Sequence, residues 1–158
     1  MHVLKKVLLI AAGFGVAVAT VSAAPLTAEE QIKFRKAGYS FMAWNMGKIK
    51  AQVVDGEVAF NKDQVAAAAR AIAGVANSGM GALYGPGTEK DAGSQKTRVK
   101  PEFFKNMDQV KKHAQKFNSE ANKLAEVAAA GDQAAIKAQF GELGKACKAC
   151  HDDFRVKD

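Results

Sequence analysis

The sequence predicts an all-α protein, an antiparallel four-helix bundle. In the C-terminal half of the chain, apolar residues recur at alternating steps of four and three, which is the heptad spacing of packed helices. Capping residues, glycines and prolines divide the chain into four helical segments, and no segment alternates as a strand does. Only about two residues join the last two segments, so these two helices must be antiparallel.

The first helix is expected from Thr27 to about Val54. Thr27 and Glu30 have the spacing of a capping box, in which each side chain satisfies a backbone N–H at the helix start. The apolar residues of its expected core face are Ile32, Tyr39, Met42, Met46, Ile49 and Val53. A second, alanine-rich helix is predicted from the cap Asn61 to about Asn77.

A glycine-rich segment, 78–100, separates the second and third helices. A loop of this length in a compact domain is usually either functional or disordered, and between helices it could cover a cofactor edge. Pro101 suits the first turn of a third helix that ends at Gly131, and Asp132 caps the fourth. The third helix carries the seam Phe103, Met107, Val110, Ala114, Phe117, Ala121, Leu124 and Ala128, and the fourth carries Ile136, Phe140, Leu143, Cys147, Cys150 and Phe154.

The stretch Cys147-Lys148-Ala149-Cys150-His151 near the C-terminus is the pattern that attaches a c-type haem. The two thiols form thioethers with the haem vinyl groups, and the following imidazole ligates the iron. On a helix, the three residues fall within about a third of the circumference. Since both cysteines occupy seam positions, we predict one covalently bound haem per chain, inside the bundle and near one end.

Three other uses of the cysteines fit less well. A thioredoxin-like redox pair belongs to an alternating strand and helix pattern, which is missing here. A structural zinc site needs four ligands, so its remaining ligands would have to be scattered histidines and carboxylates. A disulfide inside one helix closes so short a loop that it stabilises little.

Residues 1–23 have the features of a cleaved secretory signal peptide. Lys5 and Lys6 precede an apolar run, and Val21-Ser22-Ala23 offers a cleavage site. An uncleaved membrane anchor is the alternative, because the apolar run is nearly long enough to span a bilayer. Export agrees with the haem motif, since bacterial c-type haem is attached outside the inner membrane, so we expect a periplasmic protein of residues 24–158.

The mature chain is only mildly basic. Loss of two lysines lowers the formal charge from +7 to 21 − 16 = +5, and two haem propionates lower it further. The lysines and arginines are spread along helices without a recognition motif. These features favour soluble or anionic partners over nucleic acid, and no membrane contact is expected after cleavage.

The chain resembles the cytochromes c′, the class II c-type cytochromes, over essentially its whole mature length. The resemblance rests on the C-terminal position of the haem motif, on Phe34-Arg35-Lys36 and on the loop sequence 85–89, Gly-Pro-Gly-Thr-Glu. It implies that His151 is the proximal iron ligand, that Cys147 and Cys150 are the thioether anchors, and that Arg35 contacts a propionate. It also implies that Arg155 is the basic residue beside His151. Lys36 stands where the family commonly has glutamine.

The residue on the open side of the iron decides the function that the resemblance implies. In this family it lies four residues after the matched arginine, which makes it Tyr39 here. A phenol is a poor ligand for ferrous iron, so Tyr39 should leave the haem five-coordinate and high-spin; a buried core tyrosine is the other reading. Met42 and Met46 are alternative ligands, and His113, flanked by lysines, is expected on a solvated face.

The implied function is the binding of nitric oxide and carbon monoxide in the periplasm, with nitric oxide protection and electron shuttling as roles. A dry, crowded distal site excludes larger ligands and stabilises little charge on a bound one. No arrangement of base, acid and nucleophile suggests an enzyme. The rivals are a low-spin, methionine-ligated electron carrier and a thiol-disulfide enzyme.

The first helix has more large apolar residues than one face can bury. Phe34, Phe41 and Trp44 point about 110° or more away from the core stripe. Such a patch is larger than a soluble monomer usually exposes, unless the 78–100 loop folds over it. We therefore predict a two-fold homodimer through this helix, an arrangement often found in the family that the chain resembles.

Overall fold

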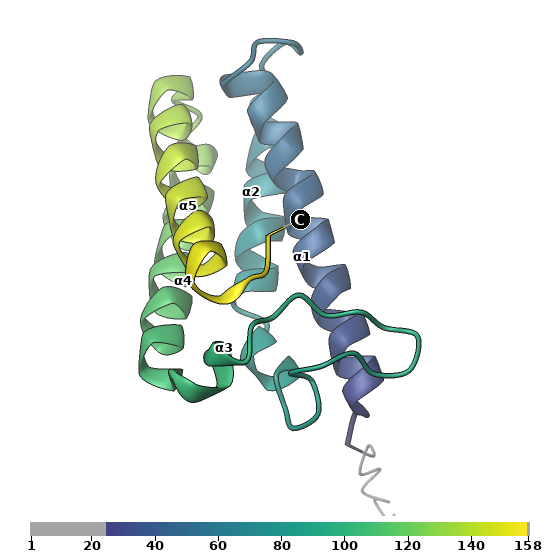
Figure 1. Cartoon of the computed structure of the whole chain (residues 1–158). Coiled ribbons are helices and arrows are strands. Elements are labelled where there is room, and N and C mark those ends of the chain that lie inside the picture. Colours follow the sequence, from purple (N-terminus) through teal and green to yellow (C-terminus); the bar gives the residue numbers. More distant parts are fainter. Residues whose placement is uncertain (1–24, 158) are drawn as a thin grey trace, which may run out of the picture.

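The computed structural model describes residues 25–157, which form a bundle of four long helices with a long loop across one end (Figure 1). The elements are α1 (Ala28–Val53), α2 (Lys62–Ala76), the 3-10 helix η1 (Met80–Leu83), α3 (Glu102–Lys105), α4 (Met107–Ala130) and α5 (Gln133–Phe154). The predicted all-α four-helix bundle is confirmed. The expected signal peptide, 1–23, lies outside the described residues. None of the described helices is long and apolar enough to cross a membrane.

The predicted helix caps are confirmed. The hydroxyl of Thr27 accepts the N–H of Glu30 at 3.2 Å, and the Glu30 carboxylate accepts the N–H of Thr27 at 2.8 Å. Asn61 and Asp132 each accept the N–H three residues on, at 3.0 Å. Gly131 ends α4 with φ +88°, a left-handed conformation that glycine adopts without strain.

The third helix is not continuous, and this part of the prediction is wrong. α3 ends at Lys105, and Asn106 leaves the helical region with φ −122° and ψ 49° before α4 begins at Met107. The short α3 places Phe103 against the loop residue Tyr84 and against Phe154 of α5. The break coincides with these tertiary contacts and with a local one, in which the side-chain amide of Asn106 donates to the carbonyl of Glu102 at 2.8 Å.

The core is solid at the end of the bundle farther from the long loop. Ile49, Leu124, Ala128 and Ile136 have no exposed surface there. The alanines of α2 let it pack closely against both α1 and α4. This end therefore has the close packing of an ordinary protein core.

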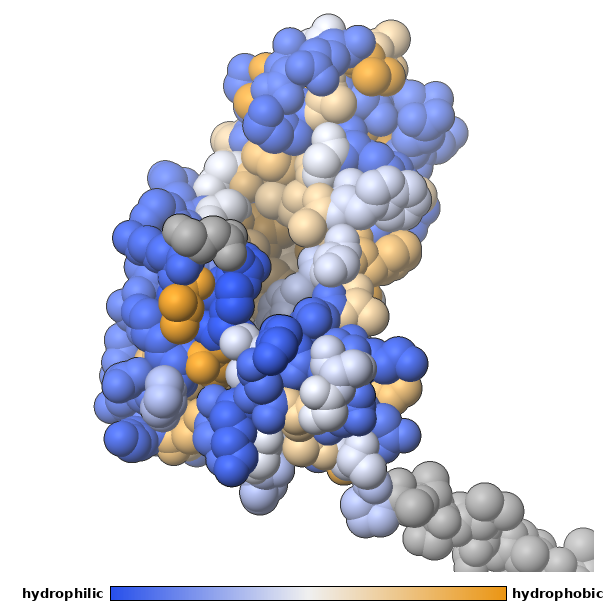
Figure 2. All heavy atoms as spheres, turned by 45° about the vertical axis from the view of Figure 1, so that its right-hand side comes forward, coloured by the Kyte–Doolittle hydropathy of each residue, from blue (hydrophilic) through white to orange (hydrophobic). Residues whose placement is uncertain are grey.

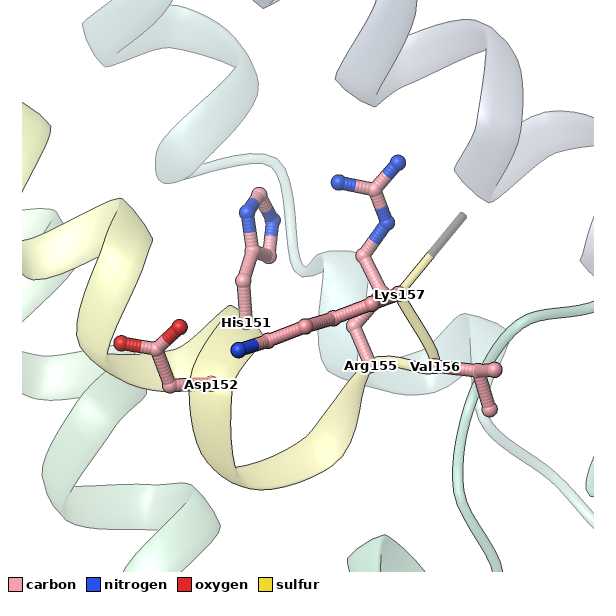
Figure 3. A pocket seen from close by; sticks show the side chains of 5 residues that line it. All are labelled: His151, Asp152, Arg155, Val156 and Lys157. Atoms are coloured by element: carbon pink, nitrogen blue, oxygen red, sulfur yellow. The ribbon is translucent and has the colours of Figure 1, made fainter.

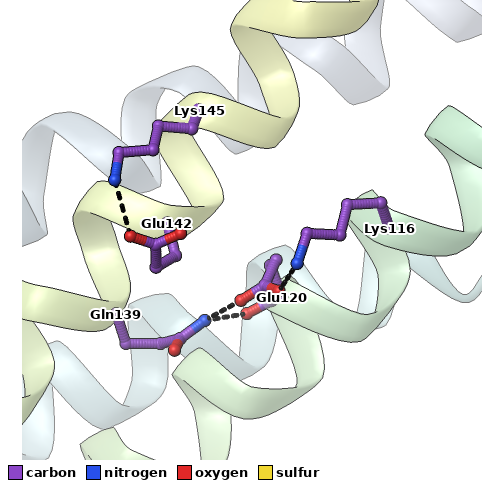
Figure 4. Close-up of polar contacts among 5 residues, drawn as sticks. All are labelled: Lys116, Glu120, Gln139, Glu142 and Lys145. Atoms are coloured by element: carbon purple, nitrogen blue, oxygen red, sulfur yellow. Dashed lines mark hydrogen bonds and ion pairs between the residues drawn. The ribbon is translucent and has the colours of Figure 1, made fainter.

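A buried polar network joins α4 to α5 (Figure 4). Glu120 accepts a hydrogen bond from the ammonium of Lys116 at 2.6 Å and from the side-chain amide of Gln139. The Gln139 amide also donates to the backbone carbonyl of Glu120 at 3.2 Å. These partners keep the pKa of Glu120 below its ordinary value, so the carboxylate is charged and satisfied.

The 78–100 loop is attached to the N-terminal half of α1. The carboxylate of Glu29 accepts both the N–H and the hydroxyl of Ser94, at 2.8 and 2.7 Å. The side-chain oxygen of Gln31 accepts the N–H of Gly85 at 2.8 Å. A Cβ on Gly85 would lie 2.7 Å from that oxygen, so a larger residue there would make the Gln31 side chain shift and weaken this hydrogen bond.

The end of the loop is attached to α5. Val99 forms an antiparallel bridge with Arg155, and the ammonium of Lys100 donates to the backbone carbonyls of Asp152 and Asp153 at 2.9 and 3.0 Å. A cation at these last carbonyls also complements the negative end of the helix dipole. The loop thus connects α1 to the end of α5.

Candidate functional site

A large cavity lies between the four long helices and the loop. Its volume is about 1060 Å³, at the upper limit of the roughly 300–1,000 Å³ usual for cofactor sites. Figure 2 shows it as a hollow whose visible walls are largely apolar. Residues that line it from the helices include Met42, Ile72, Val110, Ala114, Phe117 and Leu143. A cavity of this size and character fits a large, mainly apolar cofactor.

The haem-motif residues of α5 line this cavity together, as predicted from their helical spacing. Cys147 and Cys150 are half-buried and unpaired, and burial raises the pKa of both thiols. Protonated thiols argue against a thiol-disulfide enzyme, whose attacking cysteine needs a lowered pKa. Burial and, next, Arg98 lower the pKa of His151, which favours the neutral imidazole that a metal requires.

The zinc alternative finds no ligand set in this structure. Among residues 25–157, no three His, Cys, Asp or Glu side chains gather closely enough to hold a metal ion. A cofactor that brings its own equatorial ligands needs from the protein only the two cysteines and the histidine that α5 presents to the cavity.

Tyr39 lies on the α1 wall of the cavity, and 41% of its surface is exposed. Its hydroxyl accepts a hydrogen bond from the hydroxyl of Tyr84 at 3.0 Å. Burial raises the pKa of Tyr39, and the bond from Tyr84 opposes this only in part. Met42, which is buried, and Met46, which is half-buried, line the same wall. The phenol is thus neutral and stands beside both alternative ligands.

Arg35 also lines the cavity, but its guanidinium is directed to the loop. Only 3% of Arg35 is exposed, and it donates to the carbonyls of Leu83 and Thr88 and to the hydroxyl of Thr97, at 3.2, 2.9 and 2.6 Å. Its guanidinium carbon lies 4.6 Å from the centre of the Tyr84 ring. Arg35 therefore anchors the loop in this structure, whereas the sequence suggested only a propionate contact.

Arg155 lies one turn beyond His151, on the same side of the helix end. In Figure 3 the two side chains extend in the same direction, and both line the main cavity. They also line a smaller hollow of about 200 Å³ with Asp152, Val156 and Lys157. The structure therefore brings His151 and Arg155 to the wall of the same cavity.

The solvated-face assignment of His113 is wrong. Only 18% of its side chain is exposed; it lines the cavity, and its Nε2 lies 2.8 Å from a carboxylate oxygen of Asp153. Its ring also meets that of Phe154 edge to face. The flanking lysines are exposed as expected, and they misled the sequence reading. Lys36, in contrast, lies on the surface and donates an exposed hydrogen bond to the side chain of Gln95 at 3.2 Å.

Tyr84 is the cavity residue that the sequence analysis missed. Its ring stacks on Phe103, with centroids 4.4 Å apart and planes 19° apart, and burial raises its pKa well above the ordinary value. The sequence gives only a weak indication that Tyr84 belongs to the cavity. Tyr84 immediately precedes the Gly-Pro-Gly turn of the loop, and no helical period includes it.

The second apolar stripe of α1 is exposed, as its angular position predicted. Phe34, Phe41 and Trp44 are 48, 46 and 59% exposed, so the loop does not fold over them. The rings of Phe41 and Trp44 are in contact, with centroids 5.7 Å apart, and the Lys48 ammonium lies 4.3 Å from the Trp44 ring centre. These residues form a patch on one side of α1, which we call the α1 patch.

A haem-attachment motif on the wall of an apolar cavity, inside a four-helix bundle, defines a c-type haem protein of the helical-bundle class. The family model described as Cytochrome C' matches residues 30–155. The chain therefore belongs to the cytochrome c′ family, and its cofactor is haem c.

Several relatives are similar over most of the chain. The cytochrome c′ of Allochromatium vinosum is 61% identical over 135 residues, which cover 85% of this chain and 86% of the relative. A solved cytochrome c′ with ligand-controlled dimer dissociation is 60% identical with a TM-score of 0.81, covering 85% of this chain and 100% of that one. A nitric oxide complex of an Alcaligenes xylosoxidans cytochrome c′ variant is 30% identical with a TM-score of 0.72, covering 83% and 98% of the two chains. A carbon monoxide complex of another variant of that protein has the same values.

Proposed function

We propose that this chain is a periplasmic cytochrome c′ with five-coordinate, high-spin iron that binds nitric oxide and carbon monoxide. In this proposal Cys147 and Cys150 form the two thioethers, and His151 is the proximal ligand. The haem supplies an iron with one open coordination position, and the chain's own residues decide what reaches it. The complexes of the Alcaligenes xylosoxidans relatives with both gases support this assignment.

The observation that carries the proposal is Tyr39 of α1 on the wall of the cavity that Cys147, Cys150 and His151 of α5 also line. Its phenol is neutral and is held by Tyr84, so it occupies space without offering the iron a good ligand. The apolar walls supply few donors to stabilise charge on a bound ligand, which favours uncharged diatomic gases. Arg155, beside His151, and Arg35, at the loop, are the cationic groups that we assign to the haem surroundings.

One spectroscopic experiment tests the proposal. The visible spectrum of the reduced protein should show the broad bands of high-spin haem, and pyridine in alkali should convert it to the haem c haemochrome. Tyr39→Met should move the reduced protein toward low spin, because a thioether then faces the iron. The matched control Tyr39→Leu should stay high-spin. A parent with a sharp, resolved pair of bands would instead identify a low-spin carrier ligated by Met42 or Met46.

We also propose a homodimer formed through the α1 patch. Three exposed aromatic rings on one helix match a self-complementary, two-fold contact, and a relative is described by its dimer dissociation. Phe41→Glu should place a charge at the contact in both subunits and yield monomers by sedimentation, with the haem spectrum retained. Val58→Glu is the control, since Val58 is exposed outside the patch. A parent that sediments as a monomer at micromolar concentration would contradict the dimer.

Export and cleavage after Ala23 belong to the same proposal. The mass of the purified holoprotein from a bacterial host should equal that of residues 24–158 plus one haem. A mass that includes residues 1–23 would favour the anchored alternative.

A further inference from the structure

We propose that Tyr84 is a positioning residue that latches Tyr39 over the open side of the haem, so that a gas binds only after the Tyr84–Tyr39 hydrogen bond breaks. The inference rests on the proposed function, since it assumes that Tyr39 occupies the distal face. Its basis is the 3.0 Å hydrogen bond in which the Tyr84 hydroxyl donates to the Tyr39 hydroxyl. We call this bond the tyrosine latch.

Tyr84 is held on both faces of its ring. Phe103 stacks on it, with centroids 4.4 Å apart and nearly parallel planes. The Arg35 guanidinium lies over the ring with its carbon 4.6 Å from the centre, the geometry of a cation–π contact. These contacts leave the Tyr84 hydroxyl as a donor in a fixed place.

The groups that hold Tyr84 are themselves fixed. Arg35 is buried and donates to three acceptors of the loop, and Phe103 is buried and meets Phe154 edge to face, with centroids 5.6 Å apart. The loop is attached to both α1 and α5. Tyr84 is therefore part of the rigid frame around the cavity.

Tyr39 is the movable partner. Its ring lies on the cavity wall and, among the described residues, is not stacked between two side chains as the Tyr84 ring is. A diatomic ligand on the iron needs the space that a distal ring occupies, so Tyr39 must turn away. That movement costs the hydrogen bond to Tyr84, and the latch thus lowers gas affinity by a fixed factor.

Carbon monoxide binding to the reduced holoprotein measures that factor. Tyr84→Phe keeps the ring between Arg35 and Phe103 but removes the donor, and should raise affinity roughly two- to tenfold, the worth of one neutral hydrogen bond. Tyr39→Phe removes the acceptor of the same bond and should have a similar effect. The double variant should gain no more than either single variant, because one interaction is lost in all three.

Ser94→Ala is the matched control. It removes a hydroxyl that bonds the same loop to Glu29 at 2.7 Å, without touching either tyrosine. Its carbon monoxide affinity should equal that of the parent. An equal rise in Ser94→Ala would show that a loosened loop, not the latch, controls the affinity, and would overturn the proposal.

A second measurement reports on the bond itself. The chain contains only two tyrosines, Tyr39 and Tyr84, so ultraviolet resonance Raman spectra of the two phenylalanine variants isolate each hydroxyl. While the latch is formed, the C–O stretching region of the parent should differ from the sum of the Tyr84→Phe and Tyr39→Phe spectra. After carbon monoxide binds, the parent spectrum should equal that sum.

The outcomes separate the latch from the distal site. If Tyr39→Leu raises affinity and Tyr84→Phe does not, Tyr39 blocks the iron but the latch is wrong. If Tyr39→Leu leaves affinity unchanged, the proposed distal site is wrong, and the latch with it. Additive effects in the double variant, or a latch that stays formed in the carbon monoxide complex, would also overturn the inference.

Discussion

The heptad seam runs along the whole bundle, but the interior differs between the two ends. At the end farther from the loop, the α4 seam residues Leu124 and Ala128 are fully buried against neighbouring helices. At the loop end, Met107 is 45% exposed and Ala114 is exposed on the wall of the cavity. We call these regions the packed end and the cavity end.

The difference shows what a seam pattern encodes. Apolar spacing indicates which face of a helix points inward, but it does not indicate whether side chains or a cofactor fill the interior. At the cavity end, the residues whose sequence pattern indicates a cofactor in the interior are Cys147, Cys150 and His151. The four predictions that follow test the contrast, beginning with the largest effect.

Removing both thioether anchors should have the largest effect, and only at the cavity end. Cys147→Ala combined with Cys150→Ala should release the haem to the solvent phase on acid-acetone extraction, whereas the parent should keep it. Each single variant is a control, because one remaining thioether keeps the colour with the protein. Retention of the haem by the double variant would show that the attachment is not covalent through these residues.

Shortening a seam side chain to alanine should lower the free energy of unfolding more at the packed end than at the cavity end. Leu124→Ala leaves a cavity in a solid core and should lower the free energy of unfolding by about 2–5 kcal/mol. Met107→Ala, at the cavity end, should cost less, under about 1.5 kcal/mol, because that side chain borders the cofactor cavity and is not enclosed by a closely packed core. Urea unfolding of the two holoproteins measures both. Equal losses would mean that the cavity end is packed as tightly as the other.

Arg35 should matter more than its neighbour Lys36. Arg35→Ala removes three hydrogen bonds from a buried cation to the loop and should lower the free energy of unfolding by about 2–3 kcal/mol. It should also expose the 78–100 loop to limited proteolysis. Lys36→Ala removes one exposed bond and should change the stability by about 0.5 kcal/mol or less. A loop that resists proteolysis in Arg35→Ala would show that Glu29 and Gln31 hold it without Arg35.

The smallest effect should be a pH dependence of the α4–α5 contact. The folded pKa of Glu120 is below its ordinary value of 4.5, so its contribution to stability is present at neutral pH and is lost as the pH falls through that folded pKa. Glu120→Gln should lower the free energy of unfolding by about 1 kcal/mol at neutral pH. The variant should then lose less stability than the parent as the pH falls. Urea unfolding from neutral pH to about pH 3 measures it.

Glu142→Gln is the control for that titration. Glu142 pairs with Lys145 at 2.7 Å on an exposed surface, and such pairs contribute little. Its stability profile should follow that of the parent. If the stability of Glu120→Gln falls with pH as steeply as that of the parent, then a carboxylate other than Glu120 causes the pH dependence.

What the sequence predicted well is local. The caps at Thr27, Asn61 and Asp132 each depend on residues within one turn, and the shared face of Cys147 and His151 depends only on helical spacing. Local chemistry decides such features before the chain folds. They could therefore be predicted from the sequence.

What the sequence did not predict depends on distant contacts. The break at Asn106 falls on a regular heptad step, and it occurs where Phe103 packs against the loop residue Tyr84. His113 has exposed lysine neighbours along the chain, yet its ring contacts Asp153, 40 positions away, and lines the cavity. Tyr84 acquires its role only because the loop returns to α1.

The attachment of the loop also bears on the order in which the molecule assembles. α4 and α5 are neighbours in sequence and can pair early, whereas Arg35 and Glu29 bond to loop residues 48 to 65 positions away. Closing such long chain segments is slow, so we expect the cavity end to close last. Pulse-labelled hydrogen exchange should then protect α4 before the N–H of Gly85. A chain that closes in this order keeps its two thiols within reach of the haem-attachment machinery until late in folding.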